Sequence, residues 1–220
     1  MNNEDSSLTL LQGLHSTPAR RYLSEDPIPD EIILNILDAA IRGPSGGNRQ
    51  TWGWIIVKDQ LIKNQIAEWY REGWKKLYAP RKGEILEANA PATKFSSKNF
   101  LSAEHLANHL QDAPVWIIAV LRNTSDSDTK IAGIREGASI YGAIQNLMLA
   151  ARAYNIGSTL TTLYTVQEDK VKELLNIPED ASTMGLIPLG YPIRGRWSQP
   201  KRQELEEVTY WDSWGATKNK

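Results

Sequence analysis

Apolar residues recur every three or four positions in several stretches of the chain, which is the spacing that gathers them on one face of a helix. The clearest stretch follows Pro29, a residue that suits the first turn of a helix, and Gly43 is expected to end it. Pro18 is expected to end a shorter helix near the N-terminus. The helices predicted in this way cover residues 6–15, 30–42, 60–78, 131–154 and 167–175.

Almost continuous apolar runs predict strands at 52–58 and 115–121, and such runs are typical of strands that are buried on both faces. A third strand is predicted at 183–189. Hydroxyl and apolar residues alternate within 158–164, which favours a further strand, although this pattern is weak when taken alone. Helices and strands alternate along the chain, so we expect a single domain over residues 1–220.

Three segments lack a strong pattern: a mixed segment at 79–112, a polar loop at 125–129 and a tail at 191–220. The tail carries three tryptophans, which is too much apolar ring surface for a segment that is free in water. We therefore expect it to wrap over an apolar surface. The helix predicted at 131–154 contains three glycines, and each costs roughly 1 kcal/mol in a helix interior. These small residues indicate that another backbone approaches this helix closely.

Composition narrows the classes of function. The chain has 25 basic and 26 acidic residues, a net charge of −1 that gives no support to a nucleic-acid partner or an anionic membrane. It has no cysteine, which excludes disulfides, thiolate metal sites and cysteine nucleophiles. No apolar run approaches the ~20 residues of a membrane-spanning helix, and no secretory signal is evident. The expected location is the cytoplasm.

Two motifs were weighed as catalytic or metal sites. Residues 43–47 match the G-x-S-x-G pattern of a serine-hydrolase elbow, but that motif needs a strand before it and a helix after it, and the predicted order is the reverse. His105 and His109 have the i, i+4 spacing of metal ligands. No third ligand is suitably placed, so a polar helix face is the preferred interpretation and no metal is expected.

The loop at 44–51 and two basic pairs suggest ligand binding. Glycines at 46 and 47 permit positive φ, so that successive backbone N–H groups could converge on an anion or a ring oxygen. Asn48 and Gln50 offer donors and acceptors suited to the polar edge of a heterocycle. A tight loop without a ligand explains the same residues equally well. The pairs Arg20-Arg21 and Lys201-Arg202 suit a phosphate, or else they are solvated surface.

Three segments together resemble the FMN-dependent nitroreductase family. They are 26–59 (DPIPDEIILNILDAAIRGPSGGNRQTWGWIIVKD), 138–163 (ASIYGAIQNLMLAARAYNIGSTLTTL), and IPLGYP at 187–192 followed by PKRQELEEVTYWDSWG at 200–215. The resemblance covers about residues 15–215, and the ordered combination is specific although each piece alone is not. It implies an α+β fold in which helices flank a central mixed, mostly antiparallel sheet.

The resemblance also implies that FMN binds at the interface of a homodimer, whose subunits interlock through the long helix and exchange tails, residues 191–220. Arg202 would bind the phosphate, Arg20 the ribityl–phosphate or pyrimidine side, and the backbone of Leu163 would face the ring. The implied cofactor-binding residues are Arg20, Arg21, Ser45, Gly46, Asn48, Gln50, Thr161, Thr162, Leu163 and Arg202.

This sequence departs from the family at the start of the resemblance. The family usually has another arginine four to six residues before the position of Tyr22, where this chain has Ser16, Thr17 and Pro18. Phosphate binding is therefore expected to depend more on Arg202. Gln50-Thr51-Trp52 also replaces the family's frequent Q-P-W.

The implied activity is ping-pong hydride transfer from NAD(P)H, through FMN, to a small flat acceptor such as a nitroaromatic compound or a quinone. No catalytic side chain is expected, because the cofactor carries the chemistry. The segment 79–112 and four aromatic residues are expected to cover the site and select the acceptor, with core packing as the alternative for each ring. These residues are Trp69, Tyr70, Trp74 and Tyr78.

Three alternatives to this function stay open. The chain could be a reductive dehalogenase or a dehydrogenase of the same family, or a flavin-binding protein without turnover.

Overall fold

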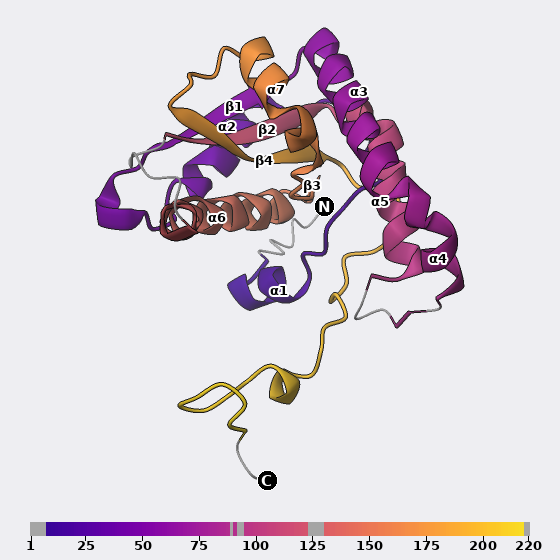
Figure 1. Cartoon of the computed structure of the whole chain (residues 1–220). Coiled ribbons are helices and arrows are strands. Elements are labelled where there is room, and N and C mark those ends of the chain that lie inside the picture. Colours follow the sequence, from indigo (N-terminus) through magenta and orange to yellow (C-terminus); the bar gives the residue numbers. More distant parts are fainter. Residues whose placement is uncertain (1–7, 89, 92–94, 123–129, 218–220) are drawn as a thin grey trace, which may run out of the picture.

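The computed structural model of the chain describes residues 8–88, 90–91, 95–122 and 130–217 (Figure 1). The polar loop expected at 125–129, and parts of the segments 6–15 and 79–112, lie outside these residues. The helices are α1 (Leu10–His15), α2 (Asp30–Ala40), α3 (Gln60–Leu77), α4 (Lys82–Glu87), α5 (Ser97–His109), α6 (Lys130–Ala153) and α7 (Glu168–Leu174). The strands are β1 (Trp52–Val57), β2 (Val115–Arg122), β3 (Gly157–Ser158) and β4 (Ala181–Gly190).

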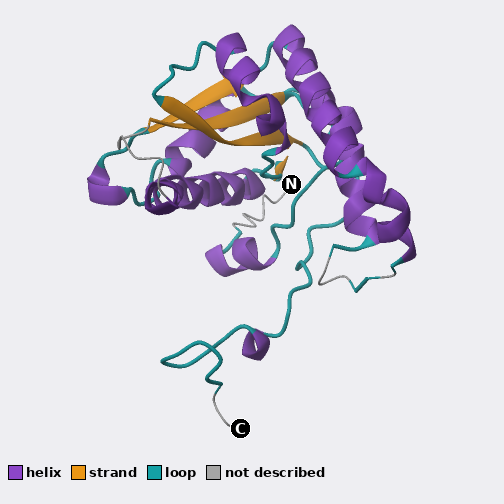
Figure 2. Cartoon of the chain, viewed as in Figure 1, coloured by secondary structure: helices purple, strands orange, loops and turns teal. Residues whose placement is uncertain are grey.

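The four strands form one sheet in the order β1-β2-β4-β3, and every described pair is antiparallel. Figure 2 shows helices on both sides of this sheet. The helices and strands thus form the α+β arrangement that was expected, although the expected mixed sheet is purely antiparallel within the part of the chain described. The predicted positions of α2, α3, α6 and α7 are confirmed to within about two residues, which is the usual scatter at helix ends.

The central strand β2 divides the interior into two apolar cores. Its side chains alternate between the sheet faces, so that Trp116 and Ile118 pack in the core under α3, α5 and α7. Ile117 and Leu121 pack in the other core, under α2 and α6. All residues of β2 except Arg122 are buried. The expectation of a strand buried on both faces is confirmed for β2.

The same expectation was wrong for β1. This strand lies at the edge of the sheet, and Trp52 through Ile55 are only half-buried while Ile56 is exposed. Apolar runs predict burial on both faces, but a strand at a sheet edge with β2 on one side only leaves part of its surface uncovered in a single chain.

The strand expected at 158–164 was also wrong for most of its length. β3 ends at Ser158, and beyond it only Thr161 forms a bridge, to Leu186 of β4. Residues Leu163–Gln167 instead form a 3₁₀ helix that buries Tyr164 in the core. The alternating hydroxyl pattern did not distinguish a strand from this bridge and turn.

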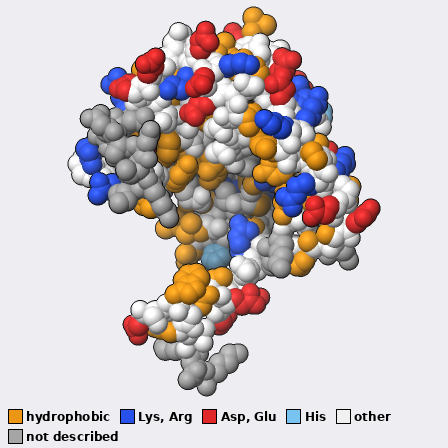
Figure 3. All heavy atoms as spheres, viewed as in Figure 1, with side chains coloured by type: hydrophobic (Ala, Val, Ile, Leu, Met, Phe, Trp, Pro, Cys, Tyr) orange, Lys and Arg blue, Asp and Glu red, His pale blue; other side chains and the backbone are white. Residues whose placement is uncertain are grey.

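The C-terminal tail leaves the body of the molecule after β4. Figures 1 and 2 show it running away from the sheet and helices, and Figure 3 shows apolar side chains on its surface. Leu205, Val208 and Trp214 are 71%, 52% and 90% exposed. The tail from residue 205 onward therefore does not cover an apolar surface of its own chain, whereas its first residues contact the body: Tyr191 packs against one core, and Trp197 lies against Arg20 and Arg152.

Candidate functional site

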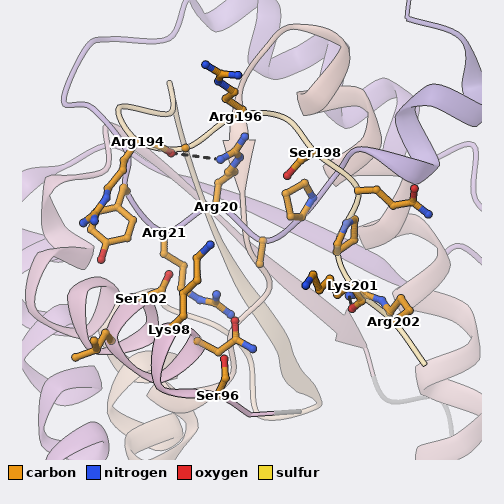
Figure 4. Close-up of a pocket in the computed structure, with 18 residues that line it drawn as sticks. Arg20, Arg21, Ser96, Lys98, Ser102, Arg194, Arg196, Ser198, Lys201 and Arg202 are labelled. Atoms are coloured by element: carbon orange, nitrogen blue, oxygen red, sulfur yellow. Dashed lines mark hydrogen bonds between the residues drawn. The ribbon is translucent and has the colours of Figure 1, made fainter. Parts of the chain in front are cut away.

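A cavity of about 1110 Å³ lies between the N-terminal segment 18–22, the start of α5 and the tail segment 194–202 (Figure 4). Of the eighteen described residues that line it, seven are basic and none is acidic. The basic residues are Arg20, Arg21, Lys98, Arg194, Arg196, Lys201 and Arg202. Such a concentration of one sign of charge raises the local concentration of anions.

Backbone pairing holds these segments together. The Arg20 amide donates to the carbonyl of Ser158 (2.8 Å), and the Ser24 amide donates to the carbonyl of Tyr191 (2.8 Å). Leu23 and Pro192 form an antiparallel bridge beside them. Gly157 is required at this junction, because a Cβ there would lie 2.8 Å from the Cβ of Arg20. The arginines near residue 20 and those near 194 are therefore placed on the same cavity.

Arg20 is buried, with 8% of its surface exposed. Its Nη1 donates to the carbonyl of Arg194 (3.3 Å), the bond drawn in Figure 4. Its Nε and Nη2 are buried without a hydrogen-bond partner among the described residues. Burial lowers the pKa of its guanidinium, and the charge of Arg152 lowers it further. Buried donors without acceptors are rare and costly, so an unpaired guanidinium edge at a basic cavity indicates a place for an anion.

Arg21, Tyr70 and Thr161 lie close to one another beside this cavity. The hydroxyl groups of Tyr70 and Thr161 are hydrogen-bonded (2.9 Å). Burial raises the pKa of Tyr70, while the Thr161 bond and the charge of Arg21 lower it. Burial lowers the pKa of Arg21. The structure thus brings Arg20, Arg21 and Arg202 onto one cavity and connects Thr161 to them through Tyr70.

Thr162 and Leu163 follow Thr161 directly, at the start of the 3₁₀ helix. Arg202 lines the far part of the cavity with an exposed side chain, and its Nη1 donates to the carbonyl of Lys201 (3.0 Å).

The other predicted group, Ser45, Gly46, Asn48 and Gln50, does not line this cavity. Its loop lies against α6, because Gly43 packs on the backbone of Ala143. Three of its N–H groups are hydrogen-bonded within the chain, and the expected role in cofactor binding stays a prediction. Gly46 N–H donates to Ser139 Oγ, Asn48 N–H to the Ser45 carbonyl, and Gln50 N–H to Ser45 Oγ.

The backbone conformation of this loop differs in part from the prediction. Gly47 has the expected positive φ (62°), as do Asn48 (53°) and Gln50 (49°), but Gly46 does not. All four predicted residues are at least partly exposed. In one chain, then, the predicted cofactor-binding residues form two separate groups.

The four aromatic residues expected to cover the site lie on and just after α3. Tyr70 and Trp74 are buried in the core beneath that helix, while Trp69 and Tyr78 are half-buried against it. The rings of Trp74 and Tyr78 stack with centroids 5.0 Å apart. Residues of the segment 79–112 share this core, Phe100 and Leu110 being fully buried. Core packing therefore accounts for Trp74, while Tyr70 also contacts Thr161.

The two histidines at i, i+4 lie in a column of stacked rings. The His105 ring stacks on Tyr22 (3.9 Å between centroids) and on His109 (4.4 Å), and His109 Nδ1 contacts Asp112. The guanidinium carbon of Arg194 lies over the Tyr22 ring, 4.9 Å from its centroid. No group of three metal-ligating side chains occurs among the described residues.

Lys98, Arg194 and Arg196 line the cavity but were not identified from the sequence, and neither were Arg152 and Trp197, which line a second cavity of about 650 Å³ beside it. The spacing of Arg194 and Arg196 just after a strand carried a weak signal. Arg152 and Trp197 carried none, because their contact depends on the tail meeting the last turn of α6. No helix in the described part of the chain is long and apolar enough to cross a membrane.

Relatives of the chain carry two kinds of name. The chain is 28% identical over 196 residues to an iodotyrosine deiodinase of Nematostella vectensis, covering 86% of this chain and 69% of that protein. It is 26% identical over 209 residues to a protein of Methanothermobacter thermautotrophicus named as an NADH dehydrogenase/NAD(P)H nitroreductase, covering 92% and 89% of the two chains.

The fold is shared with solved structures. A crystal structure of oxidized iodotyrosine deiodinase bound to FMN and 3-iodo-L-tyrosine superposes with a TM-score of 0.69 at 20% identity, covering 92% of this chain and all of the other. The family model described as the nitroreductase family matches residues 15–191, and on this match the chain belongs to the nitroreductase family.

Proposed function

We propose that the protein is an FMN-dependent oxidoreductase that transfers a hydride from NAD(P)H, by way of FMN, to a small flat acceptor such as a nitroaromatic compound or a quinone, in ping-pong order. The observation that carries the proposal is the cavity with seven basic and no acidic side chains among its described residues. Family membership and the relative named as an NAD(P)H nitroreductase support the class of reaction. FMN supplies the hydride-accepting and hydride-donating chemistry when it is bound.

The residues present fit such a cofactor. The cavity volume of about 1110 Å³ slightly exceeds the range of roughly 300–1,000 Å³ that is typical of small-molecule pockets, so there is room for such a ligand. The unpaired Nε and Nη2 of Arg20 could each donate a hydrogen bond to an acceptor of the cofactor. Arg202 offers a guanidinium at the far part of the cavity, suited to a phosphate. Thr161, whose hydroxyl is hydrogen-bonded to Tyr70, and the backbone of Leu163 are the groups proposed to orient the ring.

The proposal includes a homodimer, because one chain does not complete the site. The loop with Ser45, Gly46, Asn48 and Gln50 is accessible but remote from the arginine cavity, so a second copy would supply it. The exposed apolar residues of the tail support an exchanged tail as the contact, and Ile134 and Tyr141 of α6 are 62% and 44% exposed. An apolar surface of this kind marks a protein interface.

The proposed role of segment 79–112 is to cover the site and select the acceptor. Its α5 supplies Lys98, Leu101 and Ser102 to the cavity wall. Phe100 of the same helix is buried in the core, so packing sets the position of the helix. Its residues on the cavity wall would then determine which acceptor fits.

Reductive dehalogenation is a second candidate, favoured by the 28% identity to a protein named as an iodotyrosine deiodinase. Both reactions need the same bound flavin, and they differ in the acceptor. The purified protein, reduced anaerobically with NADPH or NADH, should be tested against nitroaromatics, quinones and halophenols. Turnover of halophenols alone would replace the first candidate with the second.

The cofactor is tested directly by its colour. We expect the purified protein to be yellow, with about one FMN per subunit, and to bleach when NADPH is added without oxygen. Flavin that binds but is not reduced by either nicotinamide would identify a flavin-binding protein without turnover. Colourless protein that takes up no added FMN would contradict the proposed function altogether.

The dimer is tested by removing residues 205–220. We expect the full chain to sediment as a dimer at micromolar concentration, and the truncated chain to lose both dimer stability and FMN affinity. A full chain that behaves as a single 24.7 kDa species would contradict the dimer. A truncated chain with unchanged behaviour would show that the tail is not part of the interface.

A further inference from the structure

Two arginines from distant parts of the chain contact one tryptophan ring. The Arg20 guanidinium carbon lies 4.3 Å from the centroid of Trp197, and that of Arg152 lies 4.2 Å from it. Arg20 belongs to the N-terminal segment, Arg152 to the last turn of α6, and Trp197 to the tail. A guanidinium that stacks on a ring uses its face, so its N–H groups stay available in the plane for an acceptor.

Most of these N–H groups lack an anionic acceptor. Nε of Arg152 is buried without a partner, like Nε and Nη2 of Arg20. The remaining donors of Arg152 reach only neutral oxygens, with Nη1 donating to Asn155 Oδ1 (3.2 Å) and Nη2 to Ser16 Oγ (3.5 Å). No carboxylate of the described residues lies within ion-pair distance of either arginine.

Two like charges held together without a counter-charge raise the energy of the free protein. Burial lowers the pKa of both guanidiniums, and the proximity of Arg152 lowers that of Arg20 further. Arginine does not lose its proton in proteins, so the charges persist and an anion is the available means of compensation.

The space around the pair is open on two sides. Arg20 lines the large basic cavity, and Arg152 lines a second cavity of about 650 Å³ together with Trp197. Ser198 and Gln199 line both cavities, so the tail segment that carries Trp197 separates them. One arginine of the pair therefore lines each cavity, and the Trp197 ring that both contact lines the smaller one.

We propose that Arg20 and Arg152 together bind a phosphate monoester, with Trp197 as the positioning residue that orients both guanidiniums. Arg152 is thereby a ligand-binding residue, in addition to the arginines assigned to the cofactor. The inference rests on the proposed function for the source of the phosphate, which is either the 5′-phosphate of FMN or the 2′-phosphate of NADPH.

The test compares Arg152→Ala with Arg122→Ala, which removes one positive charge from an exposed arginine at the end of β2, beside Asp180. Apoprotein is titrated with FMN and with riboflavin by flavin fluorescence, and the holoprotein with NADP⁺ and NAD⁺. We expect Arg152→Ala to weaken binding of one phosphate-bearing ligand about tenfold or more, the effect of losing a charge-assisted hydrogen bond. The matching ligand without that phosphate should change less than about twofold, as should all ligands in Arg122→Ala.

The two sources give different patterns. A loss for FMN but not riboflavin assigns the site to the flavin phosphate, and a loss for NADP⁺ but not NAD⁺ assigns it to the nicotinamide nucleotide. Arg152→Lys should recover only part of the affinity, because lysine lacks the planar fork. Because the Trp197 ring is proposed to position both guanidiniums, Trp197→Phe should keep most of the affinity for the phosphate-bearing ligand. Trp197→Ala should lose that affinity. Equal effects of Arg152→Ala and Arg122→Ala on every ligand would overturn the proposal.

Failure of the proposed function is distinguishable from failure of this inference. If the wild-type protein binds neither FMN nor riboflavin, the flavoenzyme assignment fails, and inorganic phosphate becomes the probe. A phosphate-induced rise in the thermal unfolding midpoint of the wild type that is absent in Arg152→Ala would still support the anion site. A rise of equal size in both proteins, or in neither, would contradict it.

Discussion

Strand β2 and the distal tail, residues 205–217, both carry large apolar side chains, tryptophan among them, but place them in opposite environments. Trp116 in β2 is fully buried and its indole N–H donates to the carbonyl of Leu110 (3.1 Å). Trp214 in the tail is 90% exposed, and its described ring contact is with Tyr210, four residues away. The apolar residues of β2 are covered by the same chain, whereas most large apolar side chains of the distal tail are exposed.

This difference bears on the proposed homodimer, in which the distal tail would contact a second copy of the chain. A large exposed indole is unfavourable in water, so burial against a second chain would be favourable. The proximal tail is different again, because Pro192 and Arg194 are held to the body and Trp197 contacts two of its arginines. The following predictions test this division, from the largest expected effect to the smallest.

Trp116→Ala should lower the free energy of unfolding by about 3–5 kcal/mol, because it leaves a cavity beneath α3 and α5 and frees the Leu110 carbonyl. Chemical denaturation followed by far-UV circular dichroism measures this change. A loss below about 1 kcal/mol would show that the buried core does not depend on this ring.

Trp214→Ala should leave the unfolding of the monomer within about 0.5 kcal/mol of the wild type, as expected for an exposed side chain. The same substitution should weaken the dimer by about 2–4 kcal/mol, the range for a tryptophan at the centre of an interface. Sedimentation at several concentrations separates the two effects. A monomer destabilised as strongly as by Trp116→Ala would break the comparison between body and tail.

Arg202→Ala should weaken FMN binding by about 1.5–3 kcal/mol, the contribution of a hydrogen bond to a charged group. Riboflavin affinity should change far less, because it lacks the phosphate. The control is Arg122→Ala, which should alter neither. Equal losses for FMN and riboflavin would mean that Arg202 holds the fold or the ring instead of the phosphate.

His105→Phe should reduce the acid sensitivity of the fold. Burial and the charges of His109 and Arg194 hold the pKa of His105 below its ordinary 6.5, although Asp112 raises it. His105 therefore binds a proton more readily in the unfolded chain than in the folded one. The contribution of neutral His105 to the free energy of unfolding is full above pH 6.5 and is lost as the pH falls through the lowered pKa of the folded state. Phenylalanine keeps the stack on Tyr22 without a titration. Identical pH dependence of unfolding in both proteins would contradict the assignment.

Much of the fold could be predicted from local pattern, because α2, α3 and α6 bury one face and β2 lies between two cores. The short β3 could not. Beyond Ser158 the chain makes one bridge at Thr161, and the side chain of Leu160 occupies the space left by Gly185, where a Cβ would meet Leu160 Cδ1. Such packing against a neighbouring strand overrides an alternating pattern.

The candidate site was predictable only where a motif marked it. Arg20, Arg21 and Arg202 were indicated by two basic pairs and then by the family resemblance, and they line one cavity. Arg152 and Trp197 are separated by about 45 positions, and a contact over that distance in the sequence cannot be predicted from local patterns. The loop at 44–51 could be recognised but not placed with the arginines, because in one chain it is positioned by α6 alone.

The pairing of the strands also determines which backbone amides solvent can reach. β2 is hydrogen-bonded to strands on both sides and supports a core on each face, so its amide protons should exchange with deuterium only when the whole domain unfolds. β1 is paired on one side only, and its outward amides should exchange through small local openings. Two adjacent strands of one sheet would thus report the global and the local stability of the same molecule.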